Sequence, residues 1–174
     1  RLVILGLVFF AGFQIHDTYV NVHNVLQYKT MVKEILATND TTANVDLVLA
    51  MIYTETKGSD GDVMQSSEST SGVANSITDS QTSIRQGVTL LSKNLTLAEE
   101  KGVDVWTAVQ AYNFGTAYID YVANHGGKST IALATEYSKN VVAPSLGNTT
   151  GESYFYHHPI ALISGGKLYK NGGN

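Results

Sequence analysis

The chain has 174 residues, of which 43% are hydrophobic and 15% charged, and its formal net charge is −4. This length and composition fit one globular domain with a core of its own. The chain is acidic overall, and its lysines and arginines form no basic stripe, which argues against nucleic acid as a partner. The absence of cysteine excludes disulfides, thiol catalysis and cysteine-based zinc sites.

An apolar run from Leu2 to Phe13 follows Arg1. The run is shorter than the roughly 20 residues that span a bilayer, but it suits an export signal or the outer part of a signal anchor whose start is missing. It is apolar all round, whereas a surface helix would show a polar face. We therefore expect residues 1–15 to be a truncated signal anchor or transmembrane segment, with a buried core helix as the alternative.

Apolar residues recur at helical spacing after this run. They predict a helix over residues 17–37, a polar break at 38–42 that offers several N-caps, and a second helix over 43–55. The second helix is apolar on most sides, which predicts that it lies in the core. Gly58 is placed to stop it.

Residues 58–80 are polar and rich in serine, threonine, glycine and aspartate, a composition typical of a flexible linker. Long structureless loops are uncommon inside compact domains, however. Val63 and Met64 are also apolar anchors within this stretch. We therefore expect an ordered loop that lines a cleft.

In the rest of the chain, apolar residues recur at helical spacing and no strand-length alternation stands out, so the pattern predicts helices and no strand. Asp104 is placed to cap one helix, and Ser129 or Thr130 the last one, which stops before Pro144. The tail from Leu146 has no clear period. The sequence thus predicts a mainly α-helical domain over residues 16–174, whose later helices cover 84–98, 105–112, 117–123 and 131–142.

Glu55 is the first candidate for chemistry. It lies at the C-terminal end of a predicted helix, where it faces the negative end of the helix dipole, and its apolar surroundings disfavour charge. Both features favour the neutral carboxylic acid, which can protonate a glycosidic oxygen. The alternative is a surface glutamate paired with Lys57 or another basic residue.

Three polar side chains could hold a sugar beside such an acid. Gln65 can donate and accept hydrogen bonds, Tyr112 offers a ring and a hydroxyl, and Asn113 offers an amide at a helix end. The alternatives are turn or cap formation for Gln65 and Asn113, and core packing for Tyr112. Met64 is expected mainly to pack in the core.

These residues fall within three short motifs. Glu55-Thr56-Lys57-Gly58 resembles the Glu-Ser-x-Gly signature of lysozyme-like lytic transglycosylases. Asp62-Val63-Met64-Gln65 is similar to their Gly-Leu-Met-Gln motif, and Ala111-Tyr112-Asn113 matches their Ala-Tyr-Asn motif. Longer stretches around the motifs resemble the lysozyme-like domain of Gram-positive cell-wall hydrolases, over about residues 17–174. The resemblance implies a lysozyme-like helical domain, here with an N-terminal anchor helix.

The resemblance also implies an activity, the cleavage of the bond between N-acetylmuramic acid and N-acetylglucosamine in peptidoglycan. Glu55 would be the sole catalytic acid/base of a lytic transglycosylase, which leaves 1,6-anhydro-muramyl ends and requires no metal or other cofactor. Thr56 replaces the usual serine, and Asp62-Val63 replaces Gly-Leu. The residues expected to contact or position substrate are Thr56, Met64, Gln65, Ser66, Glu68, Tyr112 and Asn113.

Two other activities remain open. Glu68 could be a second carboxylate, which would make the enzyme a hydrolysing muramidase; carboxyl groups about 5–5.5 Å apart favour retention and about 6.5–9.5 Å inversion. Its alternative is a surface position in the loop. The domain could also be a glycan-binding or scaffolding module without strong activity, because a fold does not determine a function.

The expected location is the outer face of a Gram-positive membrane or the cell wall, or the medium if the first segment is cleaved. The expected partners are peptidoglycan strands, the membrane through residues 1–15, and other cell-wall enzymes. The five histidines form no zinc signature and are expected to be structural or surface residues. Four aromatic residues and one proline of the tail could line a glycan groove, with core packing as the simpler interpretation for most of them: Tyr154, Phe155, Tyr156, Tyr169 and Pro159.

Overall fold

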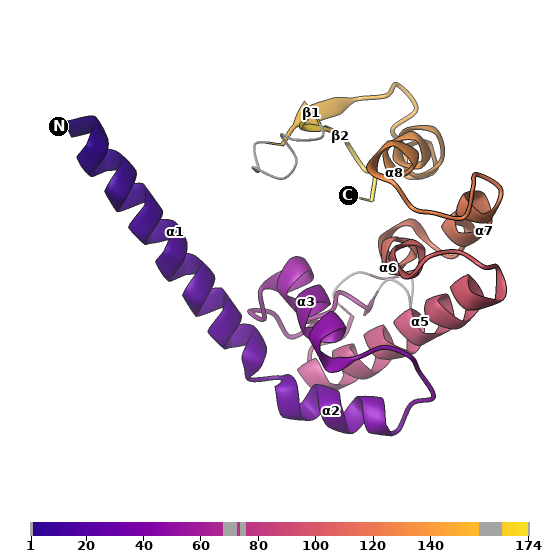
Figure 1. The fold of residues 1–174 in the computed structure, drawn as a ribbon, viewed down its shortest axis with the longest axis horizontal. Coiled ribbons are helices and arrows are strands. Elements are labelled where there is room, and N and C mark those ends of the chain that lie inside the picture. Colours follow the sequence, from indigo (N-terminus) through magenta and orange to yellow (C-terminus); the bar gives the residue numbers. More distant parts are fainter. Residues whose placement is uncertain (1, 68–72, 74–75, 157–164, 174) are drawn as a thin grey trace. The chain divides into compact units, whose positions relative to one another are not determined.

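The computed structural model describes residues 2–67, 73, 76–156 and 165–173. These residues divide into two compact units, Arg1–Ser92 and Lys93–Asn174, and each is described by itself. The fold is mainly helical (Figure 1). The first unit holds α1 (Leu2–Leu26), α2 (Lys29–Ala37), α3 (Val45–Thr56) and the start of α5 (Ser80–Glu100). The second unit holds the rest of α5, α6 (Val105–Phe114), α7 (Ala117–Ala123), α8 (Ile131–Tyr137), the π-helical segment η1 (Ser138–Val142), α9 (Ala143–Ser145), β1 (Ser153–Phe155) and β2 (Lys167–Tyr169).

Helix α1 is one continuous helix that includes the apolar run at the start of the chain (Figure 1). It ends at Leu26, and α2 begins at Lys29, so the single helix predicted over 17–37 is wrong. Both α1 and α2 contact α3. A bend between them places Val25 and Val32 in the core together, although the helical spacing in the sequence continues through it. Within the described part of the chain, no helix has both the length and the apolar character that crossing a membrane requires.

Helix α3 forms the centre of the first unit. Its N-cap is Asn44, whose side chain accepts a 2.9 Å hydrogen bond from the backbone N–H of Leu47, and not one of the residues at 38–42. The helix ends at Thr56 because Lys57 adopts the left-handed conformation, with φ of 56°. The predicted core position is confirmed, since its buried side chains are Val48, Leu49, Met51 and Ile52.

The described part of the loop after α3 consists mainly of turns and bends, and its role in lining a cleft stays a prediction. Val63 and Met64 have no exposed surface, which confirms both as apolar anchors. Helix α5 follows, and its buried residues Ile84 and Val88 recur at helical spacing as predicted.

Helices α6 and α7 follow the sequence-based prediction closely. The side chain of Asp104 caps α6 by accepting a 3.0 Å hydrogen bond from the N–H of Thr107, and α7 has the predicted bounds. Tyr118 on α7 is fully buried, and its ring lies 5.0 Å from the rings of both Phe114 and Tyr137. This aromatic cluster forms the core of the second unit.

Thr130 is the N-cap that begins the last helical stretch. The stretch reaches Val142 as predicted, but its final turns are π-helical and a further helical turn, α9, contains Pro144. A proline is tolerated there because it lies in the first turn of α9, where its missing N–H costs little. Pro144 therefore does not end the helix.

A short hairpin in the tail was not predicted. Strands β1 and β2 are antiparallel, with Tyr154 opposite Leu168. Each strand is too short for an alternating pattern to stand out. Tyr169 is buried, as expected for core packing, whereas Tyr154, Phe155 and Tyr156 are exposed and that expectation is wrong for them. Pro159 lies outside the described residues.

Candidate functional site

Glu55 is the penultimate residue of α3 and is half-buried. Met51 and Ile52, which lie on the preceding turn of the helix, are buried in the core, whereas the adjacent Thr54 is exposed. Glu55 therefore stands where the core-facing side of α3 meets the surface. This position suits a carboxyl group that must be partly desolvated and still reach a substrate.

The turn after Glu55 depends on Gly58. Gly58 has a φ of 72°, and a Cβ atom added to it would lie 2.9 Å from the carbonyl oxygen of Asn24 on α1. A side chain is therefore disfavoured twice, by the backbone conformation and by the close approach of α1. The hydroxyl of Tyr28 also donates a 3.4 Å hydrogen bond to the Gly58 carbonyl. The glycine thus allows the α1–α2 connection to pack against the end of the Glu55 helix.

Thr56 connects the first motif to the second. Its hydroxyl donates a 2.9 Å hydrogen bond to the carbonyl oxygen of Val63 and accepts a 3.3 Å bond from the N–H of Gly58. Thr56 is half-buried, and its hydroxyl makes both of these hydrogen bonds with backbone groups. Its predicted contact with substrate stays a prediction.

Asp62 is a buried carboxylate that sequence reasoning treated only as a departure from a family pattern. It is 3% exposed. Its Oδ1 accepts hydrogen bonds from Ser66 N (2.9 Å) and Ser83 Oγ (2.6 Å), and its Oδ2 from Ser67 N (3.0 Å) and Ser67 Oγ (2.5 Å). Burial acts to raise the pKa of Asp62, but the hydrogen bonds from Ser67, Ser83 and Ser66 outweigh it and hold the pKa below its usual value.

Met64 and Ser66 anchor the second motif inside the unit. Both are fully buried. The N–H of Met64 donates to Ser83 Oγ at 3.0 Å, and the hydroxyl of Ser66 lies 3.0 Å from the Ser83 carbonyl oxygen. Their predicted contacts with substrate also stay predictions.

Gln65 stands between these two anchors and is exposed. Its backbone is left-handed, with φ of 47°, which is uncommon for a residue with a side chain. Its N–H donates a 2.9 Å bond to the Asp62 carbonyl, which closes a turn over residues 62–65. The second motif is therefore a turn that presents Gln65 to solvent. Glu68 lies outside the described residues.

Tyr112 and Asn113 belong to the second unit. They lie in the last turn of α6, where Tyr112 is half-buried and Asn113 exposed. Ala111 before them is buried and holds this end of α6 in the core of its unit. That the pair approaches Glu55 stays a prediction from the order of the motifs.

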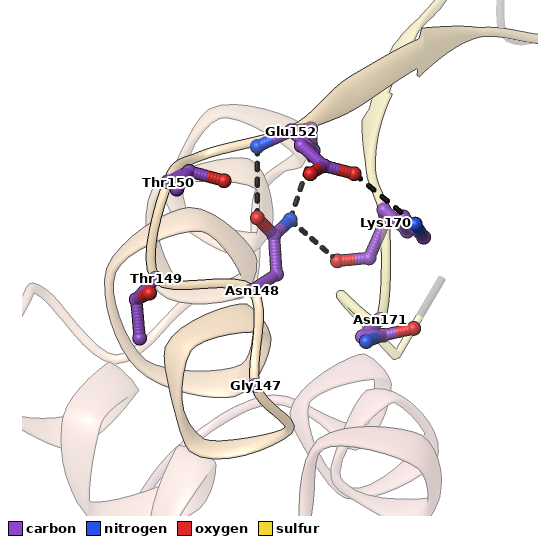
Figure 2. A pocket seen from close by; sticks show the side chains of 7 residues that line it. All are labelled: Gly147, Asn148, Thr149, Thr150, Glu152, Lys170 and Asn171. Atoms are coloured by element: carbon purple, nitrogen blue, oxygen red, sulfur yellow. Dashed lines mark hydrogen bonds and ion pairs between the residues drawn. The ribbon is translucent and has the colours of Figure 1, made fainter.

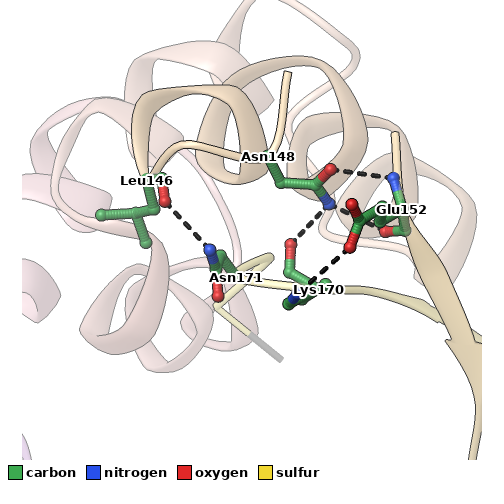
Figure 3. A network of polar contacts seen from close by, with 5 residues as sticks. All are labelled: Leu146, Asn148, Glu152, Lys170 and Asn171. Carbon is green, nitrogen blue, oxygen red and sulfur yellow. Dashed lines mark hydrogen bonds and ion pairs between the residues drawn. The ribbon is translucent and has the colours of Figure 1, made fainter. Parts of the chain in front are cut away.

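The second unit also contains a polar recess of about 180 Å³, which is lined by Gly147, Asn148, Thr149, Thr150, Glu152, Lys170 and Asn171 (Figure 2). Asn148 is buried at its base. Its amide nitrogen donates to the carbonyl oxygens of Glu152 (2.8 Å) and Lys170 (2.7 Å), and its amide oxygen accepts from Glu152 N at 2.8 Å (Figure 3). Because the protein itself satisfies the Asn148 amide, the recess is a structural junction between the helical stretch and the hairpin.

No group of three or more histidine, aspartate or glutamate side chains within the described ranges is arranged to hold a metal ion. His16 and His23 are both exposed on α1, and the ring of His23 stacks on Tyr19. His157 and His158 lie outside those ranges.

Comparison with known proteins places these features in a family. The family model described as "Lysozyme-like" matches residues 22–174. The chain is 73% identical over 168 residues to the "Pneumococcal vaccine antigen A homolog" of Streptococcus pyogenes serotype M6, covering 97% of this chain and 84% of the relative. It is 57% identical over 174 residues to "Pneumococcal vaccine antigen A" of Streptococcus pneumoniae serotype 4, covering 100% of this chain and 85% of that protein.

More distant relatives include an enzyme and a solved structure. The chain is 36% identical over 121 residues to the "Bifunctional muramidase/DL-endopeptidase CwlT" of Bacillus subtilis, covering 70% of this chain and 36% of that protein. A crystal structure from Staphylococcus aureus, titled as similar to a lipoprotein of the NLP/P60 family, superposes with a TM-score of 0.75 at 35% identity; it matches 86% of this chain, which spans 48% of that one. The resemblance predicted from the three motifs is confirmed, and the chain belongs to the lysozyme-like family.

Proposed function

We propose that this domain cleaves the bond between N-acetylmuramic acid and N-acetylglucosamine in peptidoglycan, as a lytic transglycosylase with Glu55 as its single acid/base. The observation that carries the proposal is the link between Glu55 and Gln65. Glu55 is half-buried at the end of α3, and the hydrogen bond from the adjacent Thr56 to Val63 ties that helix end to the turn that presents Gln65. Membership of the lysozyme-like family supports the same assignment.

In the proposed reaction, the neutral Glu55 carboxylic acid donates its proton to the bridging oxygen as the glycosidic bond breaks. The resulting carboxylate then accepts the proton of the muramyl 6-hydroxyl, and that oxygen bonds to the anomeric carbon. Glu55 is protonated again at the end, and no water is consumed. One carboxyl group therefore serves as acid and as base.

The other residues divide by their contacts. Gln65, Tyr112 and Asn113 are proposed to hold the sugars, because each has exposed surface and hydrogen-bonding groups. Hydrogen bonds join Thr56, Met64 and Ser66 to other parts of the first unit. These bonds support a role in holding the backbone of the site.

Hydrolysis is the second candidate reaction. It is favoured by the relative whose name includes muramidase. A hydrolysing enzyme needs a second carboxylate as nucleophile or to activate water, and Glu68 is the candidate for that role. A third candidate is a glycan-binding module, since the most similar relatives reported above are named as antigens and not as enzymes. Those names also support a location at the cell surface, where peptidoglycan and other cell-wall enzymes would be the partners.

Digestion of purified peptidoglycan, followed by mass analysis of the released fragments, tests the proposal. Anhydro-muramyl ends, one water lighter than hydrolysed ends, support the transglycosylase. Reducing muramyl ends support the muramidase. Binding to sacculi without any soluble product would contradict both reactions and favour the binding module. A Glu55→Gln variant treated in the same way controls for contaminating hydrolases.

A further inference from the structure

We propose that Asp62 is a positioning residue of the glycan-cleaving site, whose carboxylate holds the turn that presents Gln65 at a set place relative to Glu55. The inference rests on the proposed function for its catalytic consequence, but its structural part can be tested separately. It concerns the position at which the similar motif of lytic transglycosylases has glycine.

The hydrogen bonds around Asp62 require an ionised carboxylate. Ser67 Oγ accepts a 2.9 Å bond from the N–H of Ile77, and Ser83 Oγ accepts a 3.0 Å bond from the N–H of Met64. Each hydroxyl then directs its own hydrogen toward Asp62. The N–H groups of Ser66 and Ser67 point to the same carboxylate. Both of its oxygens therefore face donors, a set that only an acceptor at both positions satisfies.

The Asp62 carboxylate binds the two residues that follow the turn containing Gln65. The turn is closed by the bond from Gln65 N to the Asp62 carbonyl, and the next two N–H groups, of Ser66 and Ser67, bond to the Asp62 side chain. Left-handed backbone at a non-glycine residue persists only where its surroundings hold it. At Gln65, whose φ is 47°, the Asp62 carboxylate supplies that restraint.

The restrained turn is connected to the proposed acid/base. Val63 lies inside the turn, and its carbonyl oxygen accepts the 2.9 Å bond from Thr56, the residue after Glu55. Ser83 on α5 bonds both to Asp62 and to the backbone of the turn. Asp62 therefore fixes the turn to the start of α5, and the Thr56 bond fixes the same turn to the end of α3.

Asp62→Asn tests this role because it preserves size and replaces one acceptor oxygen with a donor amide. That amide would face either Ser67 or the pair Ser66 and Ser83, all of which donate. Asp40→Asn is the matched control, since Asp40 is an exposed aspartate in the 38–42 break. Ser67→Ala is a milder second variant, which leaves the carboxylate in place, removes one of its hydroxyl donors and also the acceptor of the Ile77 N–H, and serves if Asp62→Asn fails to fold.

The first measurement is amide hydrogen exchange by NMR, which needs no activity. We expect exchange at Gln65, Ser66 and Ser67 to rise about tenfold or more in Asp62→Asn, while the amides of α3 keep their wild-type protection. Ser67→Ala should give a smaller rise at the same amides, and Asp40→Asn none. Unchanged exchange in the turn, or an equal rise throughout α3, would overturn the proposal.

The second measurement is steady-state cleavage of glycan strands of defined length. Because small misplacements of a catalytic site reduce turnover steeply, kcat should fall about 10- to 100-fold in Asp62→Asn, with KM changed less than kcat. In a Gln65→Ala background, Asp62→Asn should lower kcat little further, because either change removes the contribution of a correctly placed Gln65 side chain. Independent, multiplicative losses would overturn the positioning role. If wild-type protein releases no product, the proposed function fails while the exchange measurement still decides whether Asp62 holds the turn.

Discussion

The hydroxyl of Thr56 lies 2.9 Å from the carbonyl oxygen of Val63 and donates a hydrogen bond to it. This bond joins two motifs that are separate in the sequence, the end of the Glu55 helix and the turn that presents Gln65. The threonine stands where the related signature has serine, and it keeps the hydroxyl that makes the bond. The relationship explains why a hydroxyl follows the proposed catalytic glutamate.

Removal of that hydroxyl should loosen the site. Thr56→Val keeps the shape of the side chain but leaves the Val63 carbonyl without its partner, which should lower the free energy of unfolding by about 1 kcal/mol. Thr56→Ser should remain close to wild type. Urea denaturation measures the difference, and cleavage of peptidoglycan should fall in Thr56→Val alone. Equal activity in the two variants would show that the bond does not support the site.

Glu55→Gln should abolish cleavage. The amide keeps the size of the side chain but can neither donate a proton to the glycosidic oxygen nor accept one from the 6-hydroxyl. Folding, followed by circular dichroism, and sedimentation with sacculi should remain as in wild type. Substantial release of fragments by this variant would remove Glu55 from its proposed role.

Glu68→Gln separates the two cleavage reactions. A transglycosylase that uses Glu55 alone should keep nearly all of its activity in this variant, with anhydro-muramyl ends as the product. A loss as deep as that of Glu55→Gln, with the fold unchanged, would instead indicate a mechanism with two carboxylates. Mass analysis of the fragments distinguishes these results.

Gly58→Ala should destabilise the domain more than Gly102→Ala. Both glycines have positive φ, 72° and 67°, which costs an alanine about 1–2 kcal/mol. Only at Gly58 would the added Cβ also meet a backbone atom, the Asn24 oxygen at 2.9 Å, whereas Gly102 has nothing within 4 Å. The two denaturation midpoints make the comparison. Equal losses would mean that α1 moves away without cost.

Stability should depend on pH through Asp62. Because its folded pKa is held below the usual value of 3.8, its contribution is present above the unfolded pKa and is lost as the pH falls through the folded pKa. The free energy of unfolding should therefore decrease on acidification below about pH 4. Asp62→Asn should be less stable at neutral pH and should lose less on acidification. Urea denaturation across this range, compared with Asp40→Asn, tests the assignment.

Much of the second unit follows from local sequence. The bounds of α7 and the cap at Asp104 were predicted because a cap and its helix lie within a few residues of each other. The hairpin of β1 and β2 was missed because its strands are far apart in the chain and too short to show a pattern. The same limit applies to Asn148, whose amide joins Glu152, just before β1, to Lys170, just after β2.

The candidate site divides in the same way. The sequence alone determined the family, the place of Glu55 at a helix end and the candidates Gln65, Tyr112 and Asn113, because motifs are local and helical periodicity is carried by neighbouring residues. Only the tertiary structure decided that Asp62 is buried among serine donors. Ser83 lies on a different helix, and a buried carboxylate is stable only where such distant donors converge on it. Only the tertiary structure showed the close approach of Gly58 to α1 as well. Close packing of two backbones produces no periodic pattern in the sequence of either segment.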